Sequence, residues 1–201
     1  MTSDMFRRSF MLSALAGAGA LLAPLPAQAL TEARARALVD EVVGDINDAI
    51  DSSGSQAAMI REFERIFERY ADVRIIAQST LGPVARRVSN AQMRAYTDAF
   101  RGYVARKYGK RFDEFRGGRV EVNSVREVKS WHEVISTAYI PGQSPFEVRF
   151  LVSDRSGQDK FFDMFVEGIS LRLSEREEIG AMLDKRNGNV DALIRDLRNA
   201  G

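Results

Sequence analysis

Few side chains in this sequence are suited to catalysis or metal binding. The 201 residues contain one histidine and no cysteine, which excludes a multi-histidine metal site, a thiolate metal site and a cysteine nucleophile. The remaining acid–base candidate is His132, at the start of a predicted strand, with Asp163 or Glu133 as the carboxylate that would orient it. We therefore expect neither an enzyme nor a cofactor, and keep an enzyme that uses His132 and Asp163 as an alternative.

Sequence motifs for other common chemistry are also missing. The chain has no Gly-x-Ser-x-Gly elbow, and no strand is followed by a glycine-rich phosphate loop or a dinucleotide fingerprint. Its 29 Lys and Arg residues nearly balance 28 Asp and Glu residues, so no strong attraction to nucleic acid is expected. A basic group at 106–111 could meet a phosphate or an acidic partner, but a solvated helix face is the simpler explanation.

The first 29 residues have the features of an export signal. Arg7 and Arg8 precede an uncharged run from Phe10 to Leu25, and Ala-Gln-Ala at 27–29 is a small-x-small cleavage site. The run is shorter than the roughly 20 residues of a membrane-spanning helix. We expect residues 1–29 to be removed and residues 30–201 to form a periplasmic domain, with an uncleaved membrane anchor as the alternative. The paired arginines resemble the twin-arginine motif, which would allow export of the folded chain.

Helices are predicted on both sides of a central strand region. Apolar residues recur every three or four positions over 31–51 and 59–70, which is typical of amphipathic helices. Thr31 and Asp72 are placed to cap the first helix and a short third one. Two further helices are expected after the strands, the first opened by a capping box at 174–177 and the second capped by Asn189.

The longest predicted helix carries an unusually aromatic stripe. It begins at a capping box formed by Ser89 and Gln92, and its apolar spacing continues to Phe115. Such a stripe is most simply part of the hydrophobic core. It could also line a cavity for an apolar ligand, because a helix laid across a curved sheet can leave such a space.

The strand region reads as consecutive antiparallel hairpins. Alternating or continuous apolar stretches are separated by short polar turns, and strands this close in sequence pair with their neighbours. In the first stretch, the alternation of apolar and polar residues shifts by one position near Ser124, which indicates a bulge. We therefore predict a single α+β domain with helices packed on a curved antiparallel sheet. The predicted strands are 120–128, 134–140, 147–152 and 160–166, with 169–173 continuing or adding to the last.

Three ordered stretches resemble the MlaC family, also called toluene-tolerance or periplasmic phospholipid-binding proteins. They are Asp72-Val73 with Leu81-Gly82, the stretch AQMRAYTDAFRGY at 91–103, and DMFVEGISL at 163–171. The similarity covers nearly all of residues 31–198. One departure is Phe161, where the family usually has tryptophan.

The resemblance implies a fold similar to nuclear transport factor 2 or cystatin, and a periplasmic carrier that holds phospholipid acyl chains between helices and sheet. It also implies partners: an outer-membrane lipoprotein complex and an inner-membrane ABC transporter complex. A hopanoid-type lipid would suit one branch of the family, and an envelope adaptor with a solid core is an alternative function. The lipid-binding residues implied are Tyr96, Phe100, Val104 and Tyr108 on the long helix, Val134, Val148, Phe150 and Val166 on the sheet, and Glu167, Gly168, Ile169 and Leu171 after it.

Overall fold

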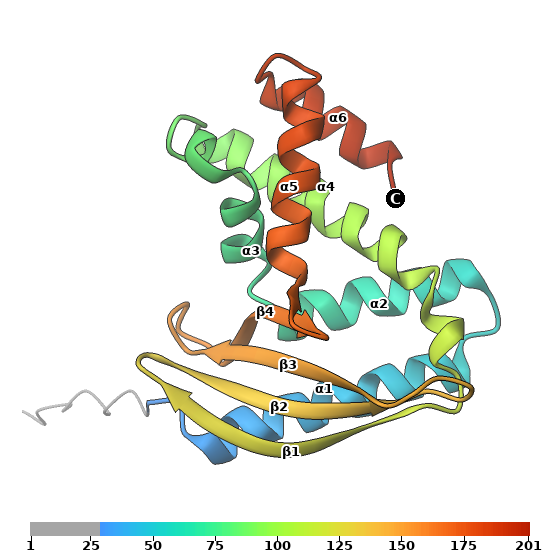
Figure 1. Cartoon of the computed structure of the whole chain (residues 1–201). Helices are drawn as coiled ribbons and strands as arrows, with labels where there is room; N and C mark the ends of the chain where they lie inside the picture. The colour runs from blue at the N-terminus through green and yellow to red at the C-terminus, as the bar shows by residue number, and fades with distance from the viewer. Residues whose placement is uncertain (1–28) are drawn as a thin grey trace, which may run out of the picture.

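The computed structural model describes residues 29–201, so the expected export signal, up to residue 28, lies outside the described residues (Figure 1). None of the helices in this described part combines the length and the apolar character that crossing a membrane requires.

The first three helices contain the apolar stretches from which the sequence predicts them. They are α1 (Glu32–Ser52), α2 (Gln56–Tyr70) and α3 (Val73–Thr80). Each is capped by a side-chain oxygen that accepts a backbone N–H of the first turn: Thr31 from Arg34 for α1, and Asp72 from Ile75 for α3. These bonds satisfy donors that a helix end otherwise leaves without partners, so the predicted capping roles of both residues are confirmed.

The long helix is shorter than its apolar pattern suggests. A 3-10 turn (η1, Gly82–Arg86) leads into α4 (Asn90–Gly109), and the predicted capping box is present in full. The helix ends at Gly109 rather than reaching Phe115, and a separate 3-10 turn (η2, Phe112–Phe115) follows. A Cβ at Gly109 would lie 3.0 Å from the Cα of Ile60. Gly109 therefore permits a close approach of α4 to α2, and the chain leaves the helix there.

The sheet of the described residues has five strands in sequence order, all antiparallel to their neighbours. The register of β1 against β2 shifts between Val122 and Ser124, which confirms the predicted bulge. The predicted α+β fold class is confirmed as well. The strands are β1 (Arg119–Val128), β2 (Trp131–Tyr139), β3 (Phe146–Ser153), β4 (Lys160–Val166) and β5 (Ile169–Ser170).

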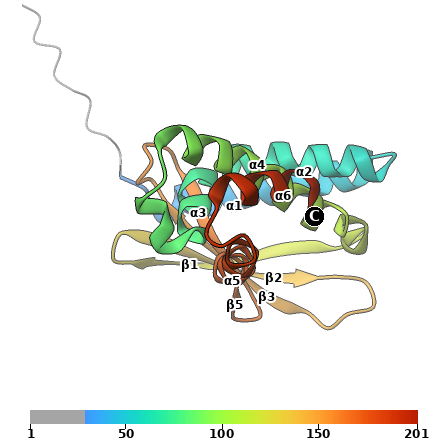
Figure 2. The ribbon, with the colours of Figure 1, turned by 90° about the horizontal axis from the view of Figure 1, so that it is seen from above.

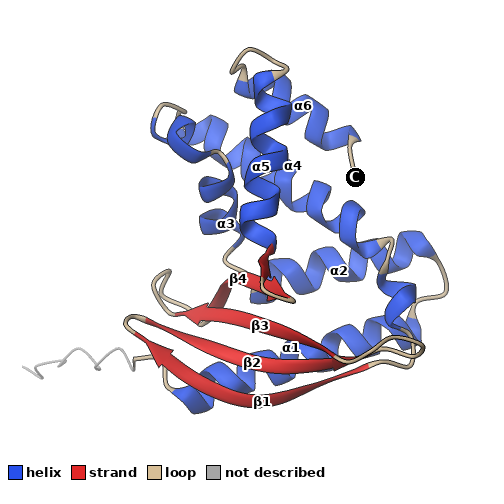
Figure 3. Cartoon of the chain, in the orientation of Figure 1, coloured by secondary structure: helices blue, strands red, loops and turns tan. Residues whose placement is uncertain are grey.

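The helices form two groups around this sheet. Helix α1 runs along one face of β1–β3, and α2 packs between α1 and α4 (Figure 1). Helices α3 to α6 stand together at the other end of the molecule, as the blue ribbons above the red sheet show in Figure 3. The helix that covers the sheet is thus α1. The long aromatic helix α4 packs mainly on other helices.

The junction after β4 differs from the sequence prediction. The strand does not continue through 169–173, because Ser170 caps α5 (Leu171–Asp184) by accepting the N–H of Leu173. The predicted capping box at 174–177 is also wrong, since Ser174 lies inside α5. Glu167 and Gly168 have φ angles of +50° and +81°, and they form the tight turn between β4 and β5. Helix α6 (Val190–Asn199) then closes the fold, with Asn189 as its cap, as predicted.

Asp163 holds this junction together. Its side chain is fully buried and forms an ion pair with Arg172. One oxygen accepts the Ser170 hydroxyl at 2.7 Å and the Arg172 Nε at 3.3 Å. The other accepts the backbone N–H groups of Met164 and Arg172. One carboxylate thereby fixes β4, β5 and the first turn of α5 relative to one another.

Replacing Asp163 by asparagine (Asp163→Asn) is expected to lower the free energy of unfolding by about 3 kcal/mol. The change removes the buried negative charge and leaves the Arg172 guanidinium without its partner. Urea denaturation measures the effect. The exposed Asp184→Asn is the matched control, expected within about 0.5 kcal/mol of the wild type. Equal effects of the two substitutions would contradict the proposed role of Asp163.

Candidate functional site

His132 and Asp163, the two residues that an enzyme would use, are separated in the structure. Direct partners across antiparallel strands share a face of the sheet. His132 is opposite Val152, whereas Asp163 is opposite Leu151. Because Val152 and Leu151 are consecutive, His132 and Asp163 point to opposite faces. The Nδ1 atom of His132 is buried without a hydrogen-bond partner in the described part of the chain.

Glu133 does not orient His132 either. As the next residue along β2 it points to the other face of the sheet. There its carboxylate binds Arg126 and lies 3.8 Å from Arg149. Among residues 29–201, no group of three or more histidine, cysteine or acidic side chains could hold a metal ion.

Six of the residues expected to bind lipid fall into two separate hydrophobic clusters. The helix cluster contains Tyr96, Phe100 and Val104 of α4, packed with apolar residues of α2, α3, α5 and α6. The sheet cluster contains Val134 and the strand residues across from it, packed with α1. All of these side chains are buried. The expected helix wall and sheet wall therefore do not face one another directly.

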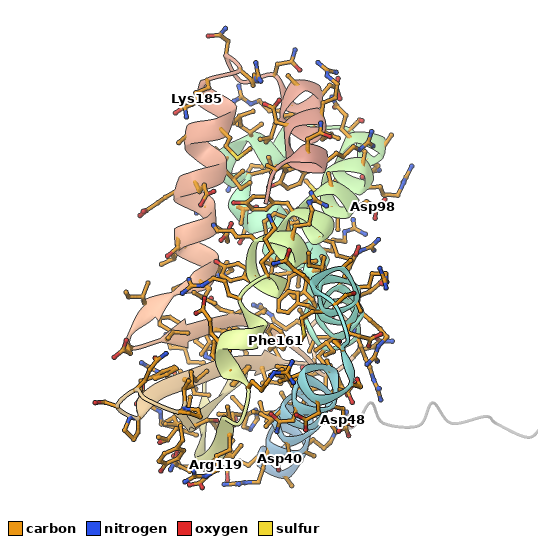
Figure 4. The ribbon with its side chains drawn as sticks, turned by 90° about the vertical axis from the view of Figure 1, so that its right-hand side faces the viewer. Asp40, Asp48, Asp98, Arg119, Phe161 and Lys185 are labelled. Atoms are coloured by element: carbon orange, nitrogen blue, oxygen red, sulfur yellow. The ribbon has the colours of Figure 1, made fainter. Side chains whose placement is uncertain are left out.

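Phe161 of β4 packs against both clusters. Its ring centroid lies 6.5 Å from that of Phe67 in the helix cluster and 5.9 Å from that of Phe150 in the sheet cluster. Figure 4 shows Phe161 between the helices and the sheet, near the middle of the molecule. We call this contact region the seam. In the conformation described, side chains occupy the seam, and the hollow expected between helix and sheet is not open there.

The remaining predicted residues lie at the edge of the fold. Val166 and Leu171 are half-buried, and Tyr108 is partly buried against the helix cluster. Glu167, Gly168 and Ile169 form the exposed turn of the last hairpin, and Ile169 is 61% exposed. The sequence predicts that the strand region extends over 169–173, which would relate Ile169 and Leu171 by strand alternation. Strand alternation does not apply to this pair, because α5 begins at Leu171.

A group of polar side chains links α4 to α5. It consists of Tyr103, Lys107 and Tyr108 from α4 and Glu175 and Glu178 from α5, and we call it the polar cluster. The Lys107 ammonium lies 2.7 Å from Glu175 Oε1 and 2.6 Å from Glu178 Oε2. The tyrosine hydroxyls also donate to these carboxylates, Tyr103 to Glu178 at 2.6 Å and Tyr108 to Glu175 at 2.5 Å.

Sequence reasoning did not find the polar cluster. It assigned Lys107 to a solvated basic face, Tyr108 to a lipid pocket and Glu175 to a capping box. The available signal was the spacing: Tyr103 and Lys107 are four residues apart, Glu175 and Glu178 three apart, so each pair lies on one helix face. Which two faces meet depends on tertiary packing alone.

Burial and hydrogen bonding shift the ionisation of the polar cluster. Burial, with the adjoining carboxylates, raises the pKa of Tyr103 and Tyr108, so both hydroxyls remain donors. Burial lowers the pKa of Lys107, but hydrogen bonds to the two glutamates more than offset it, and the net direction is upward. The pKa of Glu178 is lowered by the hydrogen bonds from Lys107 and Tyr103.

Two surface clefts lie along α4, and both are lined mainly by polar residues. One has a volume of about 360 Å³ and the other about 340 Å³, and they share Arg74 and Thr97. Neither contains any of the expected lipid-binding residues.

Fold and interior together define the class of this protein: a small α+β domain with two apolar clusters that meet at a seam. The family model described as MlaC protein matches residues 36–199. The chain therefore belongs to the MlaC family, as its motifs predicted.

A solved structure shares this fold. It is the phospholipid-binding protein from Ralstonia solanacearum, determined in complex with a phospholipid. The two chains are 20% identical and superpose with a TM-score of 0.68. The match covers 84% of this chain and 94% of the other.

The polar cluster is expected to stabilise the fold in a defined pH window. Because the pKa of Glu178 is lowered, its contribution is present above the ordinary value of 4.5 and is lost as the pH falls through the folded value. The difference in unfolding free energy between the wild type and Glu178→Gln should be about 0.5–1 kcal/mol near neutral pH, since Glu178 is about half exposed. Urea denaturation from about pH 2.5 to about pH 8 checks this, and a difference unchanged at the acidic end would contradict it.

Proposed function

We propose that this protein is a periplasmic phospholipid carrier that shuttles lipid between an outer-membrane lipoprotein complex and an inner-membrane ABC transporter complex. The observation that carries the proposal is the shared fold, over most of both chains, with a protein solved in complex with a phospholipid. Membership of the MlaC family supports the same function.

The physical need for such a carrier is large. Each methylene group exposed to water costs about 0.8 kcal/mol, so two long acyl chains cost on the order of 20 kcal/mol. Free lipid would cross an aqueous compartment at a negligible rate. An apolar protein interior removes most of this barrier, and similar affinities of donor, carrier and acceptor allow the lipid to be handed on.

The acyl chains are proposed to lie in the seam. The helix wall (Tyr96, Phe100, Val104) and the sheet wall (Val134, Val148, Phe150) are both apolar and buried. Lipid entry would separate the two clusters at Phe161 and place the chains between these walls. Residues at the edge would contact the lipid at the rim of the opening: Tyr108, Val166, Glu167, Gly168, Ile169 and Leu171. A hopanoid-type lipid meets the same apolar requirement.

The filled seam favours one alternative, an envelope adaptor that binds proteins and no lipid. An adaptor keeps Phe161 packed between Phe67 and Phe150 and requires no separation of the two clusters. The two functions differ in one measurable property, which is the presence of extractable lipid.

Protein purified from the periplasm is expected to carry phospholipid, detected by native mass spectrometry and identified after extraction. Phe161→Gln places a polar amide beside the acyl chains. Losing contact with about two methylene groups corresponds to a roughly tenfold reduction in bound lipid.

The matched control is Ile75→Gln, a similar loss of apolar surface at a residue that is 36% exposed on α3. This control should retain the lipid content of the wild type. Wild-type protein without lipid would support the adaptor, and equal lipid in both variants would remove Phe161 from the binding site.

Export and cleavage after Ala29 are also proposed, and the contacts of Leu30 support them. Its side chain is buried in the sheet cluster, and its backbone N–H donates to Asp154 Oδ2 at 3.0 Å. Cleavage of the peptide bond between Ala29 and Leu30 converts the amide nitrogen of Leu30 into a charged α-ammonium group beside the Asp154 carboxylate. A charge-assisted hydrogen bond is stronger than a neutral one, so processing would anchor the start of the mature domain to the β3–β4 loop.

A chain that starts at Leu30 should therefore depend more on Asp154 than one that starts at Ala27. Asp154→Asn is expected to cost about 1 kcal/mol more in the shorter chain. Urea denaturation of the four proteins gives the difference directly. An equal cost in both chains would show that the new terminus does not bind Asp154.

A further inference from the structure

The polar cluster encloses one ammonium group on several sides. Besides its two carboxylate partners, the Lys107 nitrogen lies 5.4 Å from the centroid of the Tyr103 ring and 5.5 Å from that of Tyr108. Carboxylates combined with aromatic faces are a recurrent way in which proteins bind ammonium groups. The arrangement is thus complementary to an amine, and the chain's own lysine fills it in the conformation described.

Lys107 leaves this arrangement incompletely satisfied. The side chain of Glu175 is 4% exposed, and its Oε2 atom is buried without a hydrogen-bond partner among residues 29–201. Leaving a buried acceptor unpaired is unfavourable. The cluster also has two carboxylates for one ammonium, so its formal charge is −1. Both features favour an additional N–H donor beside Glu175.

The position of the cluster suits a lipid headgroup. Tyr108 packs against the helix cluster, and Glu175 lies one turn after Leu171 on α5. The side chains of Lys107 and Glu178 are 29% and 48% exposed, so the same cluster also reaches solvent. Figure 2 shows α5 end-on and set apart from α4 and α2. The polar cluster therefore bridges two helices at a boundary between the apolar interior and water.

We propose that the polar cluster is a headgroup site that selects zwitterionic phospholipids with a primary ammonium over anionic phospholipids. The lipid ammonium binds Glu175 and Glu178 beside the tyrosine rings, and Lys107 moves to pair with the lipid phosphate. The lipid ammonium then takes the place of Lys107 beside the two glutamates, and the lipid phosphate takes the place of the glutamates beside Lys107. An anionic headgroup without an amine supplies no cation to the two carboxylates and is repelled by them. This inference rests on the proposed lipid carriage.

The test is a competition between two lipids. Lipid-free protein is incubated with vesicles of equimolar phosphatidylethanolamine and phosphatidylglycerol with identical acyl chains, and native mass spectrometry counts each lipid on the protein. The wild type is expected to favour phosphatidylethanolamine about tenfold, equivalent to about 1.4 kcal/mol. Glu178→Gln should reduce the preference to roughly threefold or less, because uptake of phosphatidylethanolamine falls and uptake of phosphatidylglycerol does not.

The matched control is Glu177→Gln, an exposed neighbour outside the cluster, which should keep the wild-type preference. Equal uptake of the two lipids by the wild type, or an unchanged preference in Glu178→Gln, would overturn the headgroup site and leave lipid carriage intact. Uptake of neither lipid by the wild type would overturn both proposals.

Discussion

The buried carboxylate of Asp163 is the constraint that holds the start of α5 against the last two strands of the sheet. A buried charge is tolerated only when it is paired and fully hydrogen-bonded, and Asp163 meets this condition with Ser170, Arg172 and the backbone of Met164. Those partners lie on different elements, so satisfying the charge fixes the hairpin turn and the start of α5. The family-like stretch at 163–171 is therefore a strand–turn–helix junction held by one carboxylate.

Fixing the start of α5 also fixes which of its side chains reach α4. Glu175 lies four residues after the first residue of α5, and Glu178 three further on, so both project from one face. That face meets Tyr103 and Lys107 on α4. The polar cluster thus follows from the junction geometry, and the proposed headgroup site would be lost if α5 began at Ser174.

The interior combines dense packing with a natural plane of separation. Interiors packed at crystal-like density rarely open within a continuous cluster. Here the helix cluster and the sheet cluster are each continuous, and Phe161 packs against both. Separation at the seam would disturb few contacts within either cluster. A carrier must accept and release its lipid, and an interior divided into two clusters is compatible with both steps.

Local interactions explain the features that can be predicted from the sequence. Thr31, Asp72, Ser89 and Asn189 cap helices because each side chain accepts the N–H three residues further on. Four strands, their hairpin order and the bulge near Ser124 follow from alternation over a few positions. The order of predicted helices and strands indicates the α+β class, and the motifs at 72–82, 91–103 and 163–171 indicate the family.

The features that depend on contacts between residues far apart in the chain follow from the tertiary structure. Ser170 and Ser174 are equally good caps locally, and the choice of Ser170 follows from its bond to Asp163, seven residues earlier on another strand. The placement of His132 and Asp163 on opposite faces required the register of three strands. The pairing of Lys107 with Glu175 joins residues 68 positions apart. Local periodicity cannot supply such pairings, because it shows which face of an element is apolar and not which element will cover it.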